Sequence, residues 1–157
     1  MSESTGGTSR ASENTGARLQ AALGLLLQRR HRAKIYGELL EPFAGTVDEA
    51  TYPVLSGLGR SGPTTSVRLG AEIGLDRSVV SRHSDRLEAL GLLRRSPDPD
   101  DARATLLILT EAGEEVVARL RARLAAIFQR RLDSWPPEQA DAFVAGLERF
   151  VRETLGD

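Results

Sequence analysis

The sequence of 157 residues contains no cysteine and only two histidines. The absence of cysteine excludes disulfide bonds and thiolate metal sites, and it excludes oxidant sensing through thiols of the chain itself. Two histidines without cysteine do not form a recognisable zinc-binding pattern. We therefore expect no metal site and no cofactor.

Long apolar runs are also missing. A membrane-spanning helix needs about 20 mostly apolar residues, and none of the apolar runs in this chain approaches that length. The N-terminus lacks the apolar segment of a signal peptide. The sequence therefore predicts a soluble cytoplasmic protein without membrane association, of the size of one ordinary domain.

Lysine is nearly absent, because Lys34 is the only lysine among 21 basic residues. Arginine suits bidentate contacts with phosphate and guanine. An arginine bias also arises in G+C-rich genomes, and the net charge of −1 does not indicate a nucleic-acid binder. Composition alone leaves both interpretations open.

The N-terminal third is predicted to contain a tail and two helices. Residues 1–16 have one apolar residue after Met1, so we expect a disordered tail. Apolar residues then recur at helical spacing, which predicts one long helix over residues 17–44 with Pro42 in its last turn. Gly45 ends it, and a second helix opens at Val47 with Pro53 near its start.

The central stretch, residues 64–110, reads as helix, turn, helix and a two-stranded hairpin. Thr64, Thr65 and Ser66 are residues that begin helices, and the following helix would bury Val67, Leu69 and Ile73. Gly74 supplies the turn and Asp76 caps a second helix that ends at Gly91. Its expected inward residues are Val80, Leu87 and Leu90.

The outward face of that second helix is polar. Spacings of three and four place on one face Arg77, Ser78, Ser81, Arg82 and Asp85. Arginine can bind guanine or phosphate, and serine makes short contacts where a backbone comes close. A polar helix face more often simply faces solvent, so the prediction of DNA binding depends on the segment C-terminal to this helix.

A charged hairpin succeeds the helix. Strands are expected over residues 92–95 and 103–109, joined by a turn with two prolines and three aspartates. In this arrangement Asp101 would hold the Arg103 guanidinium in position for a narrow minor groove. The same two residues could equally serve to fasten the hairpin, and both roles are compatible.

The C-terminal part is predicted as two helices. Thr110 caps the first, and the prolines at 136 and 137 lie in the first turn of the last. The long N-terminal helix and these two carry more apolar surface than a small three-helix unit can bury, so we expect a homodimer built from them.

These motifs, in this order and spacing, give the chain a clear resemblance. The segments Leu69–Leu75, Arg77–Arg82, Asp85–Arg95, Asp98–Ala104 and Leu109–Gly113 resemble the MarR family of bacterial transcription regulators, over residues 17–155. The resemblance implies a mainly α fold with a small β-hairpin wing. It divides residues 17–157 into a winged helix-turn-helix domain, 47–110, and dimerisation helices, 17–44 and 111–157.

The resemblance also implies a function. It predicts a homodimeric, sequence-specific DNA-binding regulator, most often a repressor on a pseudo-palindromic operator, released by a small aromatic or anionic effector. Arg103 would be the wing-tip arginine with Asp101 as its partner. The DNA-binding residues expected by position are Thr65, Ser66, Arg77, Ser78, Ser81, Arg82, Arg86, Arg94, Arg95, Asp101 and Arg103.

Two features depart from the family pattern, and one alternative function remains. Ala102 replaces a second basic residue in the wing, and His83 and Ser84 replace apolar residues. We expect His83 to be at least half-buried and bonded to a neighbour.

The segment from residue 60 to residue 103 contains eight arginines and seven acidic residues, so its charge is nearly balanced. This balance leaves open an alternative function, a helical dimer that acts through protein contacts and has a degenerate winged domain. No catalytic constellation is recognisable, so an enzyme is not expected. The resemblance implies an effector pocket between the dimer helices and the winged domain, which Tyr36 and Tyr52 could line, but two tyrosines are more often ordinary core or surface residues.

Overall fold

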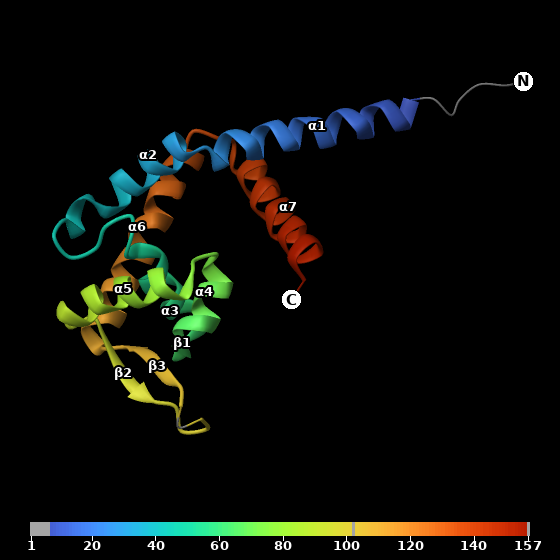
Figure 1. Cartoon of the computed structure of the whole chain (residues 1–157). Coiled ribbons are helices and arrows are strands. Elements are labelled where there is room, and N and C mark those ends of the chain that lie inside the picture. Colours follow the sequence, from blue (N-terminus) through green and yellow to red (C-terminus); the bar gives the residue numbers. More distant parts are fainter. Residues whose placement is uncertain (1–6, 102, 157) are drawn as a thin grey trace, which may run out of the picture. The chain divides into compact units, whose positions relative to one another are not determined.

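The computed structural model describes residues 7–101 and 103–156 (Figure 1). The chain divides into two compact units, Met1–Tyr52 and Pro53–Asp157. The fold is mainly α-helical with a small three-stranded antiparallel sheet, as expected. Among the described residues, no helix has the length and apolar character needed to span a membrane.

The first unit contains α1 (Gly7–Leu27), α2 (Arg29–Leu40) and the short 3-10 helix η1 (Glu41–Phe43). The prediction of one uninterrupted helix is wrong, because Gln28 adopts an extended conformation with φ −61° and ψ 135°. No glycine or proline marks this break. The Leu25 carbonyl oxygen in the last turn of α1 accepts a hydrogen bond from the Gln28 N–H (3.2 Å), and the His31 Nδ1 lies 2.6 Å from the same oxygen.

The expected disordered tail is corrected for residues 7–16, which form the first turns of α1. Residues 1–6 lie outside the described part of the chain. Residues 14–16 are exposed, so this part of α1 buries no core. Extending an existing helix adds one backbone hydrogen bond for each residue, and this explains how a segment of polar sequence can continue α1.

Helix α3 (Tyr52–Ser61) begins five residues later than the sequence suggests. Asp48 causes the delay, because its Oδ1 accepts hydrogen bonds from the backbone N–H groups of Ala50 (3.1 Å) and Thr51 (2.8 Å). Such an aspartate-centred turn competes with helix formation. Pro53 lies in the first turn of α3, as predicted.

The second unit continues with α4 (Ser66–Ile73), α5 (Arg77–Ala89) and the strands β2 (Leu93–Pro97) and β3 (Thr105–Leu109). A two-residue strand, β1 (Thr64–Thr65), was not predicted and pairs with β3, giving the sheet order β1-β3-β2. In the hairpin, Leu93 pairs with Leu109 and Pro97 with Thr105. Figure 1 shows this hairpin projecting to one side of α5, with the turn between β2 and β3 at its far end.

The core of this region is closely packed. Its fully buried members come from α3, α4, α5, β2 and β3: Val54, Leu55, Leu58, Leu69, Val80, Leu87, Leu93 and Leu107. Gly113 lies so close to the hairpin that an added Cβ would be 1.9 Å from the Leu92 carbonyl oxygen. Val67 and Leu90 were expected inside, but they are 57% and 46% exposed; Val67 lies in the first turn of α4 and Leu90 is the C-cap of α5.

Two longer helices complete the chain. Helix α6 (Glu111–Leu132) starts at Thr110, whose Oγ1 accepts a hydrogen bond of 3.1 Å from the Gly113 N–H, so the predicted cap is confirmed. Helix α7 (Pro137–Leu155) begins with Pro137 in its first turn, also as predicted. The rings of Trp135 and Phe143 pack at a centroid separation of 5.4 Å.

Candidate nucleic-acid interface

The helix-turn-helix is fixed by local backbone chemistry. Thr65 Oγ1 accepts a hydrogen bond from the Arg68 N–H at 3.3 Å and so caps α4. Gly74 takes the left-handed conformation (φ 70°), and the Leu75 N–H donates to the Gly70 carbonyl at 2.9 Å. Asp76 precedes α5 as predicted, but among the described residues its side chain makes no capping hydrogen bond. These contacts set the direction in which α5 leaves the turn.

Helix α5 presents a polar face to solvent. Arg77, Ser78 and Arg82 are exposed and Ser81 is half-buried, as their spacing predicts. The opposite face buries Val80, Ser84 and Leu87, each with 0% exposure. The exposed side chains near the start of α5 therefore form a strip of arginine and serine with the composition that contacts bases and phosphates.

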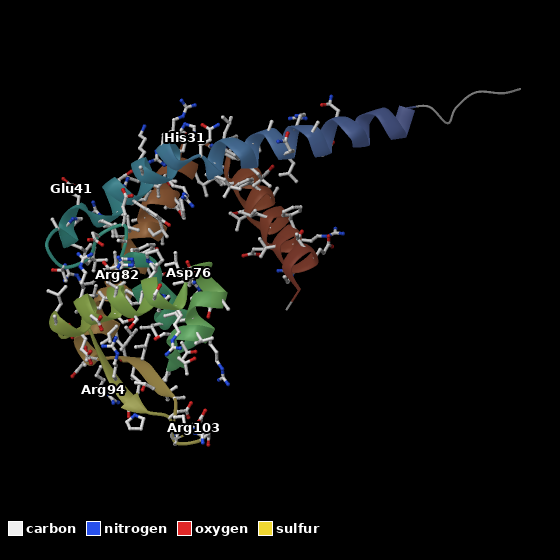
Figure 2. All side chains as sticks on the ribbon, viewed as in Figure 1. His31, Glu41, Asp76, Arg82, Arg94 and Arg103 are labelled. Atoms are coloured by element: carbon white, nitrogen blue, oxygen red, sulfur yellow. The ribbon has the colours of Figure 1, made fainter. Side chains whose placement is uncertain are left out.

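The two arginines of β2 have different surroundings. Arg94 is exposed (Figure 2), whereas the side chain of Arg95 is only 27% exposed. Arg95 Nη2 lies 2.7 Å from Asp85 Oδ1 and 3.4 Å from the Ser81 carbonyl oxygen, and Nη1 donates to Glu88. The sequence predicted that Asp85 lies on the solvent-facing side of α5, but in the structure its carboxylate forms an ion pair with Arg95 of β2.

The wing turn is organised by aspartates. Asp101 Oδ1 accepts a hydrogen bond from the backbone N–H of Arg103 at 2.9 Å, and Asp98 Oδ1 accepts one from the N–H of Asp100 at 3.0 Å. The expectation that Asp101 holds the Arg103 guanidinium is therefore corrected. Asp101 instead bonds to the backbone two residues on, a turn that aspartate commonly forms. Of the two roles weighed for this pair, the structure supports fastening the hairpin.

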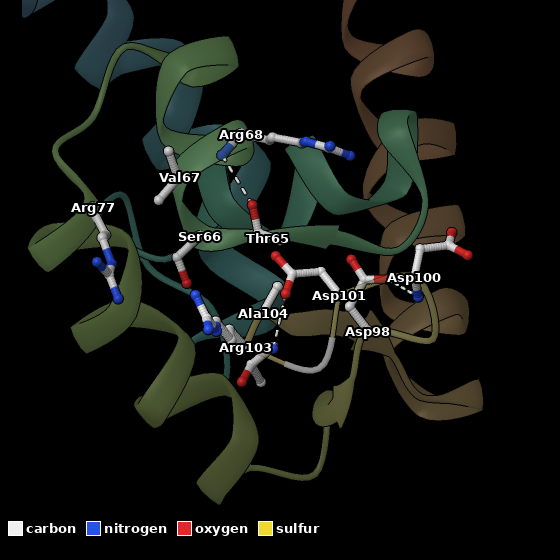
Figure 3. Close-up of a pocket in the computed structure, with 11 residues that line it drawn as sticks. Thr65, Ser66, Val67, Arg68, Arg77, Asp98, Asp100, Asp101, Arg103 and Ala104 are labelled. Carbon is white, nitrogen blue, oxygen red and sulfur yellow. Dashed lines mark hydrogen bonds between the residues drawn. The ribbon is translucent and has the colours of Figure 1, made fainter.

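A hollow of about 640 Å³ lies between the wing turn and the starts of α4 and α5 (Figure 3). It brings together Thr65, Ser66, Arg77, Asp101 and Arg103 from the predicted set. Figure 3 shows the Arg103 guanidinium on the side of the hollow where Ser66 lies. Segments that are far apart in sequence thus contribute arginines and hydroxyl groups to one concave surface, together with the three aspartates of the wing turn.

Arg68 also lines this hollow, although the sequence did not single it out. Its position in the first turn of α4, next to two predicted contacts, was the signal that could have identified it. Within the part of the chain that the structure describes, Arg68, Arg77, Arg82, Arg94 and Arg103 form no ion pair. Their charges are therefore available to an anionic partner. Arg86, another predicted contact, is exposed in the last turn of α5.

His83 and Ser84 lie on the less exposed side of α5. The Nδ1 of His83 and the Oγ of Ser84 are buried and have no hydrogen-bond partner among the described residues. His83 is half-buried as expected, but its expected bond to a neighbour is not seen at Nδ1. The described residues include no group of three or more potential ligands that could hold a metal ion.

A second hollow, of about 300 Å³, lies between α3, β3 and α6. Its lining includes the apolar residues Leu58, Ile108 and Val117, together with Arg121. Arg121 Nη2 donates a hydrogen bond to the Gly59 carbonyl, so this cation is fixed beside an apolar surface.

Tyr36 and Tyr52 pack edge to face in the first unit, with ring centroids 5.3 Å apart and an interplanar angle of 60°. Burial raises the pKa of the Tyr36 phenol above its usual value, and the nearby Tyr52 raises it further. Arg32 acts in the opposite direction. The pair thus has the partly buried position of core tyrosines, one of the two roles considered for it.

Comparisons with known proteins agree with this architecture. A model of the MarR family matches residues 48–105. The chain is 32% identical over 108 residues to YhbI of Bacillus subtilis (strain 168), an uncharacterized HTH-type transcriptional regulator, and the match covers 67% of the chain and 69% of that protein. It is 29% identical over 116 residues to the HTH-type transcriptional repressor NicR of Pseudomonas putida, with 72% of each protein covered.

Solved structures give the same fold. A MarR family protein from Bacillus stearothermophilus superposes with a TM-score of 0.75 at 23% identity, covering 91% of this chain and 97% of that one. The agreement extends well beyond the winged region that the family model matches.

Proposed function

Because the chain belongs to the MarR family of transcription regulators, we propose that it is a homodimeric repressor that binds a pseudo-palindromic operator. In this proposal α5 enters the major groove and the wing reaches the adjacent minor groove. A small aromatic or anionic effector releases the complex. The residues proposed to contact DNA are those expected from the sequence, except that Arg95 and Asp101 have other roles, while Arg68 joins the set.

The observation that carries the proposal is the arrangement of arginines around α5 and the wing. Arg77 and Arg103 line the 640 Å³ hollow from two different elements, and Arg82 is exposed one turn further along α5. Phosphates attract such clusters at long range, whereas base edges are read by individual arginines and serines at contact. The hollow therefore supports an interface that combines both kinds of contact.

Homodimer formation is supported by the apolar surface of α7. Phe143, Leu147, Phe150 and Val151 recur at helical spacing, yet each is between 39% and 49% exposed. Most of the stability of a helix in a protein comes from packing of its apolar face, and soluble proteins rarely expose a continuous apolar stripe. A second copy of the chain covers such a stripe symmetrically and places two copies of α5 on successive turns of DNA.

Repression and effector release are the regulatory part of the proposal. The relative NicR is named a transcriptional repressor. The 300 Å³ hollow combines an apolar lining with the fixed cation of Arg121, and one carboxylate, that of Glu114, also lines it. Such a composition suits a small aromatic acid, whose ring binds apolar surface and whose carboxylate binds arginine.

The test is a titration of fluorescent duplexes from the region immediately upstream of the gene, with nonspecific competitor present. We expect a discrete complex of two chains per duplex that resists competitor and weakens as salt rises. Small aromatic acids added to this complex should release the duplex. If upstream duplexes fail, the operator is sought by selection from random duplexes. A protein that selects no sequence would contradict the proposed function.

A further inference from the structure

We infer that Arg95 is a positioning residue of the DNA-reading surface. It acts on DNA binding through Asp85 and Glu88 of α5 and does not contact DNA itself. This inference rests on the proposed function, and it changes the role that sequence position alone gave to Arg95.

The backbone of the wing fixes where Arg95 lies. Arg95 occupies the middle of β2 and pairs with Leu107 of β3, a fully buried residue. Neighbouring residues of a strand point to opposite faces, so Arg94 is exposed and Arg95 faces α5. The guanidinium therefore reaches α5 from a strand that cannot shift without disturbing the core.

Three acceptors on α5 receive this guanidinium. They belong to Ser81, Asp85 and Glu88, which share one face of the helix because they lie four and three residues apart. Both terminal nitrogens of Arg95 are used: Nη2 binds Asp85 and the Ser81 carbonyl, and Nη1 binds Glu88. A planar guanidinium held at both ends is not available to grip a phosphate as well.

The charges explain why this contact bears on DNA binding. The side chain of Asp85 is 64% exposed and that of Glu88 is 39% exposed, and both belong to the helix proposed to enter the major groove. Two carboxylates on this helix repel phosphates unless a cation lies beside them. Arg95 supplies that cation, and it also ties the helix to the wing at a fixed angle.

The experiment is a double-mutant cycle on full-length protein, using the operator duplex identified by the titration or by selection. Arg95→Met is made in the wild-type background and in an Asp85→Asn/Glu88→Gln background, where Arg95 has lost both ionic partners. Arg149→Met serves as a control for the loss of one ion-paired arginine, because Arg149 pairs with Glu153 on α7, far along the chain from the wing. Circular dichroism checks that each variant is folded.

We expect Arg95→Met to weaken operator binding about tenfold in the wild-type background, since unmasked like charges cost binding energy. In the neutralised background the same change should alter affinity less than about twofold, because its effect passes through the two acids. The dependence of log affinity on log salt should have the same slope with and without Arg95 in that background. Arg149→Met should bind like wild type.

Equal losses in both backgrounds, with the salt slope falling by about 0.9 for one lost phosphate contact, would overturn the inference and make Arg95 a DNA ligand. Equal losses with an unchanged slope would also overturn it, since Arg95 would then act independently of the two acids. A wild-type protein that selects no duplex is a different result, because it removes the proposed function and the inference together.

Discussion

The winged region and helix α7 use their apolar residues in opposite ways. In the winged region, Leu69, Val80 and Leu87 have 0% exposure. On α7, Phe143 is 49% exposed and Leu147 is 45% exposed, although the helical spacing of the apolar residues is just as regular. Regular spacing therefore predicts that a helix has an apolar face, but it does not tell whether the same chain covers that face.

The comparison separates two kinds of structural element. The winged region completes its own core, so its exposed residues are free to be polar and to bind DNA. Helix α7 instead leaves its apolar stripe exposed, and in the proposed homodimer a second copy of the chain covers that stripe. Substitutions in the two regions test this division, beginning with the change expected to have the largest effect.

The largest effect is expected from a charge placed in the α7 stripe. Leu147→Glu puts a carboxylate where we propose two copies of the chain pack, so the dimer should be lost and operator binding with it, because one copy of α5 reads only half a site. Sedimentation velocity and the duplex titration measure both effects. Ala145→Glu is the matched control, since Ala145 lies on the opposite face of α7. A Leu147→Glu protein that remains dimeric would refute the proposal that the α7 stripe forms the dimer interface.

The next largest effect concerns glycines that differ in their surroundings. Gly113→Ala forces a Cβ to 1.9 Å from the Leu92 carbonyl oxygen, a backbone atom that cannot move alone. We expect a loss of about 3 kcal/mol in the free energy of unfolding, the upper end for overpacking.

On α7 the same substitution should have the opposite sign. Gly146 has nothing within 4 Å of its added Cβ and lies away from the centre of the apolar stripe. Gly146→Ala should therefore stabilise the protein by about 0.5 to 1 kcal/mol through helix propensity. Urea unfolding of both variants measures the difference. Equal effects would mean that the two regions are packed alike.

A third prediction concerns the exposed part of the winged region. Arg103→Ala should weaken operator binding by about 1 to 2 kcal/mol, because a charge-assisted contact is lost. The free energy of unfolding should stay unchanged, since Arg103 is exposed and Asp101 binds only its backbone. Asp101→Ala is the informative partner, as it should loosen the turn and weaken binding while Arg103 remains. Affinity unaffected by Arg103→Ala at physiological salt would show that the wing stays outside the groove.

The sequence predicted what local chemistry determines. Thr65, Gly74 and Thr110 were placed correctly because caps and turns depend on a few neighbouring residues. The break at Gln28 was missed because neither glycine nor proline marks it. The strand β1 was missed because two residues carry no periodicity, and it exists only through its pairing with β3.

The candidate site was predicted less completely, for a physical reason. Position along α5 indicates which side chains face outward, but not what later segments bring against them. Asp85 is outward on its own helix, and the ion pair with Arg95 forms only once β2 packs beside it. The sequence predicted a contact between Asp101 and the Arg103 guanidinium, whereas Asp101 Oδ1 accepts a hydrogen bond from the Arg103 backbone N–H. Aspartate commonly bonds to the backbone two residues on, and position in the sequence does not reveal which group of Arg103 it binds.

The smallest effect is expected in the first unit, at Tyr36. Because burial raises the pKa of the folded-state phenol above its usual value of 10.0, the unfolded chain loses this proton first as pH rises. The contribution of the Tyr36 proton to the free energy of unfolding is therefore fully present below about pH 10 and is lost as pH rises above it. Tyr36→Phe keeps the ring against Tyr52 but removes the proton, so its free energy of unfolding should decline less between pH 9 and about pH 11. Tyr52→Phe is the control and should keep most of the decline, because burial, the larger cause of the raised Tyr36 pKa, remains when the smaller contribution of Tyr52 is lost. Identical pH profiles for wild type and Tyr36→Phe would mean that this phenol is as well solvated in the folded protein as in the unfolded chain, and that the first unit buries less than its packing indicates.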